Sequence, residues 1–302
     1  MTNNRKYIIF QCYGDKNIFF ECTYALLSLS KIMLLFPVRD LEIWIYTDNK
    51  EWFTTFKNCN LPLFFKEIDE NVLYNWRGEI NFVHRIKIEI LKDFVGNNVG
   101  NIFYSDTDVL FKNDINIVFQ NIDQDTLYMH TMEGYINESK NPVIKKLNDF
   151  LDKENLKDEN NNSLNEKAMW NAGMLGFNTN YSLLLDKVLV FTDNTYKKYP
   201  KHVIEQFSFS VYFQQTGNIK SAAPYIIHYW NVKEMRILLA SFFLFFKDSD
   251  WNELIKYSTL IDVSVLMQEK MNFYSNRSIV AKIQKKHWLP ILPNWDKLLK
   301  QL

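Results

Sequence analysis

The sequence is poor in glycine, proline and cysteine, and it has no excess of charge of either sign. Its 302 residues include 8 glycines, 7 prolines and 3 cysteines. The cysteines (Cys12, Cys22 and Cys59) are odd in number and show no metal-binding spacing, which indicates reduced thiols in a cytoplasmic protein. The formal net charge is zero, so no global field attracts nucleic acid, and no nucleic-acid-binding motif is present.

Long hydrophobic runs are also missing. The longest, 237–246, is too short to span a bilayer, and the polar start of the chain lacks a signal-peptide core. Hydrophobic residues make up 47% and charged residues 23% of the chain, as in ordinary globular proteins. The aromatic share of 16% is high, which fits a core rich in Phe and Tyr or a site that stacks on flat ligands.

Short apolar runs alternate with helical patterns over the first 119 residues. Strand patterns cover 7–10, 41–46, 63–68 and 102–104, and helical patterns cover 17–35, 51–56 and 82–95. This alternation predicts an α/β fold, with a Rossmann-like, doubly wound and mostly parallel sheet covered by helices. Ligands of such sheets lie beyond the carboxyl ends of the strands.

The most informative motif is Asp106-Thr107-Asp108, directly after the apolar strand pattern. Alternate residues of a strand point the same way, so Asp106 and Asp108 can face one point. Unpaired buried carboxylates are strongly disfavoured. Two hard oxygen ligands at a strand end suit a divalent cation that also takes substrate phosphates. The alternative is a pair of turn acids beyond a strand.

Polar residues also follow the first two predicted strands. Gln11, Tyr13 and Asp48 stand at these strand ends, where they would surround a nucleoside. A carboxylate can accept the ring N–H of uracil, and a tyrosine can stack on the base. Asp48 could equally cap the short helix predicted at 51–56.

Four motifs occur in a fixed order between about residues 5 and 235. They are Phe103-Tyr104-Ser105-Asp106-Thr107-Asp108, Asn171-Ala172-Gly173-Met174-Leu175-Gly176, Glu205-Gln206 and His228-Tyr229-Trp230. This order resembles the A-type (GT-A) fold of nucleotide-sugar glycosyltransferases, nearest the glycogenin-like and bacterial galactosyl- and glucosyltransferase families. The resemblance implies metal-dependent transfer of a hexose from a UDP-sugar to a glycan or lipid-linked acceptor.

The same resemblance implies the metal and donor sites. It assigns Mn²⁺ or Mg²⁺ to Asp106, Asp108 and His228, with the metal bridging the two phosphates of the donor. Taken alone, His228 could also be a core histidine hydrogen-bonded in a strand. The donor contacts that the resemblance implies are Asp106, Asn171, Gly173, Gln206 and Lys233. The glycine and Pro-Trp usual around that lysine in the family are absent here.

Two further residues are candidates for catalysis. Lys87 falls within the apolar stripe of the helix predicted at 82–95, so it needs an anionic partner, either the donor diphosphate or Asp106. Alternatively it extends to the rim of the site. Glu205 fits a general base for an acceptor hydroxyl, or a helix N-terminal acid stabilised by the dipole. Inverting and retaining chemistry therefore both stay open.

Two other functions compete with sugar transfer. A sugar nucleotidyltransferase shares the architecture, but it needs a glycine-rich loop with nearby basic residues after the first strand. This chain offers Gly14 and Lys16 there, without an arginine. A non-catalytic nucleotide-sugar-binding module is the other candidate, and the intact Asp106, Asp108 and His228 argue against it.

The chain divides into a predicted catalytic domain, 1–234, and a helical extension, 235–302. Residues 277–302 contain six basic residues against one acidic residue, Asp296, interleaved with Trp288, Trp295 and aliphatic side chains. Such a segment suits peripheral contact with an anionic membrane, here on its inner face. The alternative is that its apolar side caps the core and its lysines face solvent.

Overall fold

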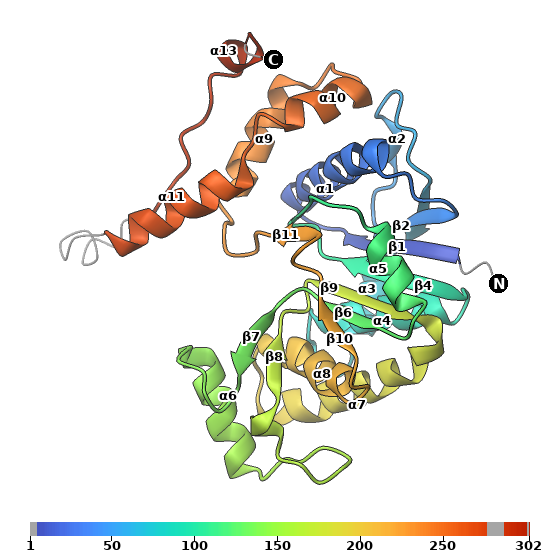
Figure 1. Ribbon diagram of the computed structural model, residues 1–302, viewed down its shortest axis with the longest axis vertical. Coiled ribbons are helices and arrows are strands. Elements are labelled where there is room, and N and C mark those ends of the chain that lie inside the picture. Colours follow the sequence, from blue (N-terminus) through green and yellow to red (C-terminus); the bar gives the residue numbers. More distant parts are fainter. Residues whose placement is uncertain (1–4, 277–286, 301) are drawn as a thin grey trace.

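A seven-stranded sheet forms the centre of the computed structural model, which describes residues 5–276, 287–300 and 302 (Figure 1). Its strand order is β10-β6-β9-β4-β1-β2-β3. The strands are β1 (Arg5–Cys12), β2 (Leu41–Thr47), β3 (Leu63–Glu67), β4 (Gly100–Ser105), β6 (Leu127–Met129), β9 (Met174–Asn178) and β10 (Ile219–Ser221). β9 runs antiparallel to both neighbours, and the other pairs are parallel. The predicted α/β fold with a mostly parallel sheet is confirmed.

Helices cover both faces of this sheet. The described helices are α1 (Lys16–Leu35), α2 (Glu51–Thr54), α3 (Glu70–Arg77), α4 (Arg85–Val95), α5 (Asn116–Ile122), α6 (Pro142–Lys153), α7 (Ser182–Lys198), α8 (Val203–Gln214), α9 (Met235–Phe245), α10 (Trp251–Ser258), α11 (Val263–Ser275) and α13 (Trp295–Leu299), and not all of them contact the sheet. Alternate residues of β1 enter different cores. Ile8 and Phe10 join α1 and α9, whereas Tyr7 and Ile9 join α4 and α7. Burial on both faces explains why the strand patterns read as continuous apolar runs.

Two small antiparallel ribbons extend the sheet region. β5 (Val109–Phe111) pairs with β11 (Ile226–His228), and β7 (Met132–Tyr135) pairs with β8 (Ala168–Trp170). The second ribbon, with α6 and α8, surrounds a separate apolar cluster. Figure 1 shows this part at the opposite end of the molecule from α9, α10 and α13. The first ribbon positions the candidate site.

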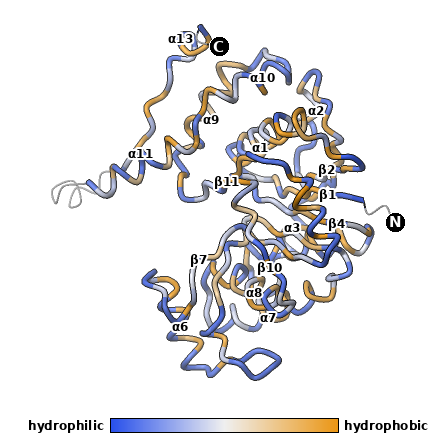
Figure 2. The backbone as a smooth tube through the Cα atoms, viewed as in Figure 1, coloured by the Kyte–Doolittle hydropathy of each residue, from blue (hydrophilic) through white to orange (hydrophobic). Residues whose placement is uncertain are grey.

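The C-terminal helices pack on the core as well as extending from it. Leu239 and Phe242 of α9 are fully buried in the cluster that contains residues of α1. Figure 2 shows hydrophobic residues along α1 and α9. Trp288 and Trp295 are 8% and 4% exposed and join the same cluster. These burials favour the core-capping interpretation of the tail. Residues 277–286 and 301, which belong to the predicted basic segment, lie outside the described residues.

α1 is the described helix that is long and apolar enough to cross a membrane. However, 67% of its apolar window is buried within the protein. A core helix of this length passes the same test of length and composition. It packs against β1 and α9, which suffices to explain its hydrophobicity.

Candidate metal and nucleotide site

The two aspartates directly follow β4, which is a central strand, and lie where the parallel strands have their carboxyl ends. The backbone bends after Ser105 instead of staying extended, so the alternation of a strand does not aim the two carboxylates. They are aimed by neighbours: the N–H of Asp106 donates to the carbonyl of Gly173 at 2.8 Å, and the carbonyl of Asp108 accepts from the N–H of Tyr229 at 3.0 Å. The predicted convergence of the two acids is observed, and the bond from Tyr229 brings the end of the distant segment 226–228, with His228, beside Asp108.

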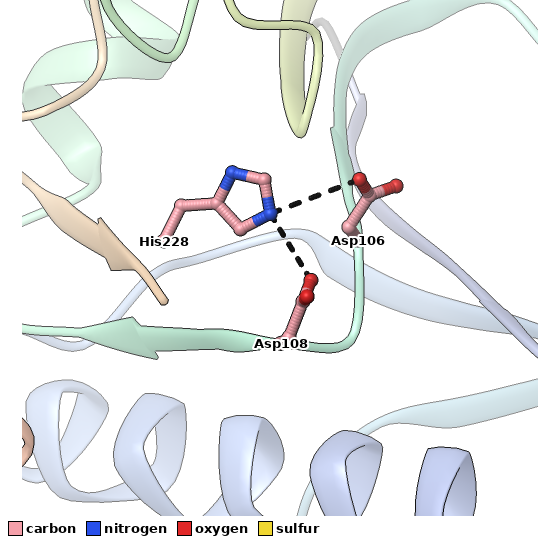
Figure 3. Close-up of side chains that lie close together, drawn as sticks. All are labelled: Asp106, Asp108 and His228. Carbon is pink, nitrogen blue, oxygen red and sulfur yellow. Dashed lines mark hydrogen bonds and ion pairs between the residues drawn. The ribbon is translucent and has the colours of Figure 1, made fainter. Parts of the chain in front are cut away.

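The β5/β11 ribbon places His228 beside both acids. His228 pairs in register with Val109, directly after Asp108. Its Nε2 lies 3.0 Å from Asp108 Oδ1 and 3.9 Å from Asp106 Oδ2 (Figure 3). One ligand atom from each of the three residues lies within 4.8 Å of the others. The sequence-based expectation of His228 near the Asp108 carboxylate is met.

Asn171 fixes the tautomer of His228. The Asn171 amide is oriented by two bonds, because Oδ1 accepts from the N–H of Gly173 at 3.0 Å and Nδ2 donates to Glu133 Oε1 at 3.2 Å. His228 Nδ1 lies 2.9 Å from the same Oδ1, which accepts only, so Nδ1 carries the proton. When a divalent ion is bound, the neutral ring would present its Nε2 lone pair to that ion, as in metal-binding histidines held by a second hydrogen bond.

Gly173 permits the close approach of this histidine. A Cβ at Gly173 would stand 2.1 Å from His228 Cε1 and 2.3 Å from Nδ1. No side chain fits at that distance, so the residue must be glycine for His228 to reach the acids. The donor contacts predicted for Asn171 and Gly173 stay predictions, and both residues are occupied in holding the imidazole.

Lys87 is buried and lies between two carboxylates. It is 4% exposed, and its Nζ lies 3.3 Å from Asp106 Oδ1 and 3.2 Å from Glu205 Oε1. It also donates to the carbonyl of Ala172 at 2.9 Å. Burial opposes the charge, but the two acids outweigh it and raise the pKa of Lys87 above its ordinary value. Extension to the rim is therefore excluded, and the predicted anionic partner is Asp106.

Glu205 lies in the first turn of α8 and is 4% exposed. Burial raises its pKa to about 7, although Lys87 acts in the opposite direction. A carboxyl with this pKa can exchange a proton near neutral pH. Its neighbour Gln206 donates to Glu133 Oε2 at 2.9 Å, which ties α8 to β7.

Two clefts open on either side of these groups. One, of about 290 Å³, is lined by Gln11, Tyr13, Ile18, Glu21, Val83, His84, Lys87, Asp106, Thr107, Asp108, Lys233 and Arg236. The other, of about 300 Å³, contains Asn171, Glu205, Gln206, His228 and Trp230 among its lining residues. The sequence-predicted site residues thus meet in two adjoining clefts, with the exception described next.

Asp48 is the predicted donor contact that lines neither cleft. Its Oδ2 accepts from the N–H of Gly14 at 2.9 Å, which joins the ends of β1 and β2. It does not cap α2, because Asn49 Oδ1 accepts from the N–H of Trp52 instead. Its contact with a nucleoside stays a prediction.

Lys233 lines the first cleft with a side chain that is exposed to solvent. Its Nζ lies 3.2 Å from Asp108 Oδ2, and its side chain is 58% exposed. Burial alone would raise the pKa of Asp108, but without an ion a protonated His228, which donates from Nε2, and Lys233 outweigh burial and hold the pKa of Asp108 well below its ordinary value. Sequence reasoning missed Glu21, Glu133 and Arg236, whose partners lie far away along the chain. The one available signal was Glu21, an acid within the long apolar helix pattern.

Comparisons with known proteins give distant similarities of fold to solved structures. No protein-family model and no curated protein sequence matches the chain. The galactosyltransferase LgtC, in complex with donor and acceptor sugar analogues, has a TM-score of 0.45 at 11% identity, over 71% of this chain and 72% of that chain. Mouse xyloside xylosyltransferase 1, in its apo form, has a TM-score of 0.48 at 12% identity, over 72% and 84%. Scores this low assign no function, which rests on the side chains.

Proposed function

We propose that the protein is a metal-dependent glycosyltransferase that moves a hexose from a UDP-sugar to a glycan or lipid-linked acceptor. The observation that carries the proposal is the convergence of Asp106, Asp108 and the Nε2 of His228 within 4.8 Å, beside a cleft with several cations. We place the protein in the cytoplasm or on the inner face of the membrane.

The donor set fits Mn²⁺ or Mg²⁺. Two carboxylates and one neutral imidazole are ligands that divalent ions of intermediate hardness accept. The imidazole favours Mn²⁺ over harder ions such as Ca²⁺. When bound, such an ion neutralises charge on the leaving diphosphate. The protein contributes orientation, since Asn171 and Gly173 hold the His228 ring and Lys87 holds Asp106.

The remaining groups fit the two substrates. Gln11 and Tyr13 line the first cleft, where a nucleoside would lie beyond the end of β1. Glu205 and Gln206 line the second cleft, where an acceptor hydroxyl would approach. Glu205 is our candidate for accepting the proton of that hydroxyl. Whether configuration is inverted or retained depends on the position of the bound sugar.

Calorimetry with UDP, with and without Mn²⁺, tests the proposal. We expect binding that depends on Mn²⁺ and that weakens about 100-fold in Asp108→Asn, because even residues that only orient metal ligands typically contribute about 10- to 100-fold to metal affinity. Thermal melting checks that the variant is folded. Metal-independent UDP binding in both proteins would show that the acids are structural.

Product analysis separates the competing functions. Incubation with a UDP-sugar and Mn²⁺ should release UDP slowly by hydrolysis. Release of pyrophosphate from UTP and a sugar phosphate would indicate a nucleotidyltransferase. Binding of UDP-sugar without either product, in the presence of varied acceptors, would indicate a binding module.

A further inference from the structure

The first cleft contains an ion pair to which the proposed reaction assigns no role. Glu21 lies on α1 and is 1% exposed, and a buried carboxylate is costly unless it is paired. Arg236, at the start of α9, donates from Nε to Glu21 Oε1 at 2.9 Å and from an Nη to Oε2 at 3.1 Å. This two-point contact fixes the plane of the guanidinium against the wall of the cleft.

Arg236 has hydrogen-bond donors left over. A guanidinium carries five N–H groups, and the contacts with Glu21 use two of them. The Arg236 side chain is 32% exposed and lines the cleft together with Asp106 and Asp108. An anion beside those acids, with its divalent ion, would therefore meet an oriented cation.

The other two cations of the cleft, Lys87 and Lys233, each lack one of these two properties, a fixed position and spare donors. Lys87 Nζ already lies within 3.3 Å of three acceptors, which matches its three N–H groups. Lys233 Nζ lies on Asp108 at the end of an exposed side chain that is free to rotate. Among the described residues that line this cleft, Arg236 is the cation that is both held in place and supplied with spare donors.

We propose that Arg236, oriented by the buried Glu21, contacts the diphosphate of the nucleotide-sugar donor. The inference rests on the proposed function and assigns Glu21 as a positioning residue. Arginine suits this task because its planar fork matches two phosphate oxygens, whereas lysine offers a point charge.

Binding of three probes to Arg236→Met tests the contact. With Mn²⁺ present, we expect roughly tenfold or greater loss of affinity for UDP, the size of a lost charge-assisted hydrogen bond. Affinity for uridine, measured by ligand-observed NMR, should not change. Inorganic pyrophosphate should lose affinity in parallel with UDP. Arg236→Lys should recover part of the loss.

Two further variants separate positioning from general damage. Glu21→Gln keeps the side-chain shape but weakens the fork, so it should reduce UDP affinity less than Arg236→Met and leave uridine unaffected. Lys270→Met is the matched control, because it breaks the ion pair of Lys270 with Glu234, and neither of these two residues lines this cleft. It should bind UDP like the wild type. All measurements are made well below the melting temperature of each variant.

Each outcome decides the inference. Wild-type affinity for UDP in Arg236→Met overturns it. An equal loss for uridine and UDP also overturns it, because that result means the pair only ties α9 to α1. If the wild type binds pyrophosphate with Mn²⁺ but prefers no nucleotide, and Arg236→Met loses pyrophosphate, the anion contact stands and the proposed function falls. If the wild type binds neither UDP nor pyrophosphate with Mn²⁺, both the anion contact and the proposed function are wrong.

Discussion

The two walls of the first cleft hold their cations in opposite ways. On one wall the Lys87 side chain is 5% exposed and lies between Asp106, Glu205 and a backbone carbonyl. On the other wall the Lys233 side chain is 58% exposed and contacts one carboxylate. Burial makes the first cation part of the fold, since removing it leaves the buried Glu205 without its cation and takes one of the partners of Asp106. Exposure leaves the second cation free to follow a ligand.

This contrast teaches that the two lysines, although they line the same cleft, should differ in what they stabilise. Lys87 should chiefly maintain the arrangement of the acids, and Lys233 should chiefly contribute to anion affinity. The following predictions can break or sharpen that distinction, in order of decreasing expected effect.

Lys87→Met should lower the free energy of unfolding by roughly 3 kcal/mol or more, because it removes the cation that lies between the buried Glu205 and the half-buried Asp106. Chemical denaturation measures the change. Lys92→Met is the matched control in the same helix, since Lys92 pairs with Asp186 at the surface, and its effect should stay within about 0.5 kcal/mol. If Lys87→Met is as stable as the wild type and has a normal Michaelis constant and turnover for the donor, Lys87 neither maintains the arrangement of the acids nor acts on the donor, and the contrast with Lys233 fails.

Glu205→Gln should reduce the transfer rate about 100-fold if Glu205 accepts the acceptor's proton. Its pKa of about 7 means that the group is protonated below that pH. The wild-type kcat/KM should therefore rise with pH through about 7, and the variant should lose this rise. A pH profile that is unchanged in the variant would leave Glu205 as a partner of Lys87 only.

Lys233→Met should weaken Mn²⁺-dependent UDP binding about tenfold while leaving stability nearly unchanged, as is usual for exposed side chains. Calorimetry and thermal melting measure the two quantities. Lys233→Arg keeps the charge and should bind within a few-fold of the wild type. Destabilisation of Lys233→Met as large as that of Lys87→Met would contradict the proposal that Lys233 contributes to anion affinity and not to stability.

The smallest effect concerns membrane contact of the C-terminal segment. Trp288 and Trp295 are buried, so we expect weak sedimentation with anionic vesicles at low salt. The exposed Leu289, Ile291 and Leu292 supply the remaining apolar surface. Strong, salt-sensitive sedimentation would support the membrane interpretation, in which the C-terminal segment brings the site to a lipid-linked acceptor.

Much of the first half of the fold was predictable, and less of the second half. The continuous apolar runs of β1, β2 and β4 and the long helix α1 are visible because local periodicity and burial agree there. α6, α7 and β9 were not assigned, since short strands and mixed surfaces leave weak patterns. Asp48 lies outside both clefts, because a strand-end position alone does not aim a side chain.

The sequence by itself determined the α/β class and marked Asp106, Asp108 and Lys87 as chemically costly residues that need partners, whereas His228 was indicated only by the order of the motifs. Only the tertiary structure decided who those partners are. His228 meets Asp108 through a ribbon between segments 120 residues apart, and Glu21 meets Arg236 across 215. Local pattern reports how much a side chain is buried and on which face. The direction of a carboxylate or a guanidinium depends on backbone hydrogen bonds and close packing, which form only when distant segments come together.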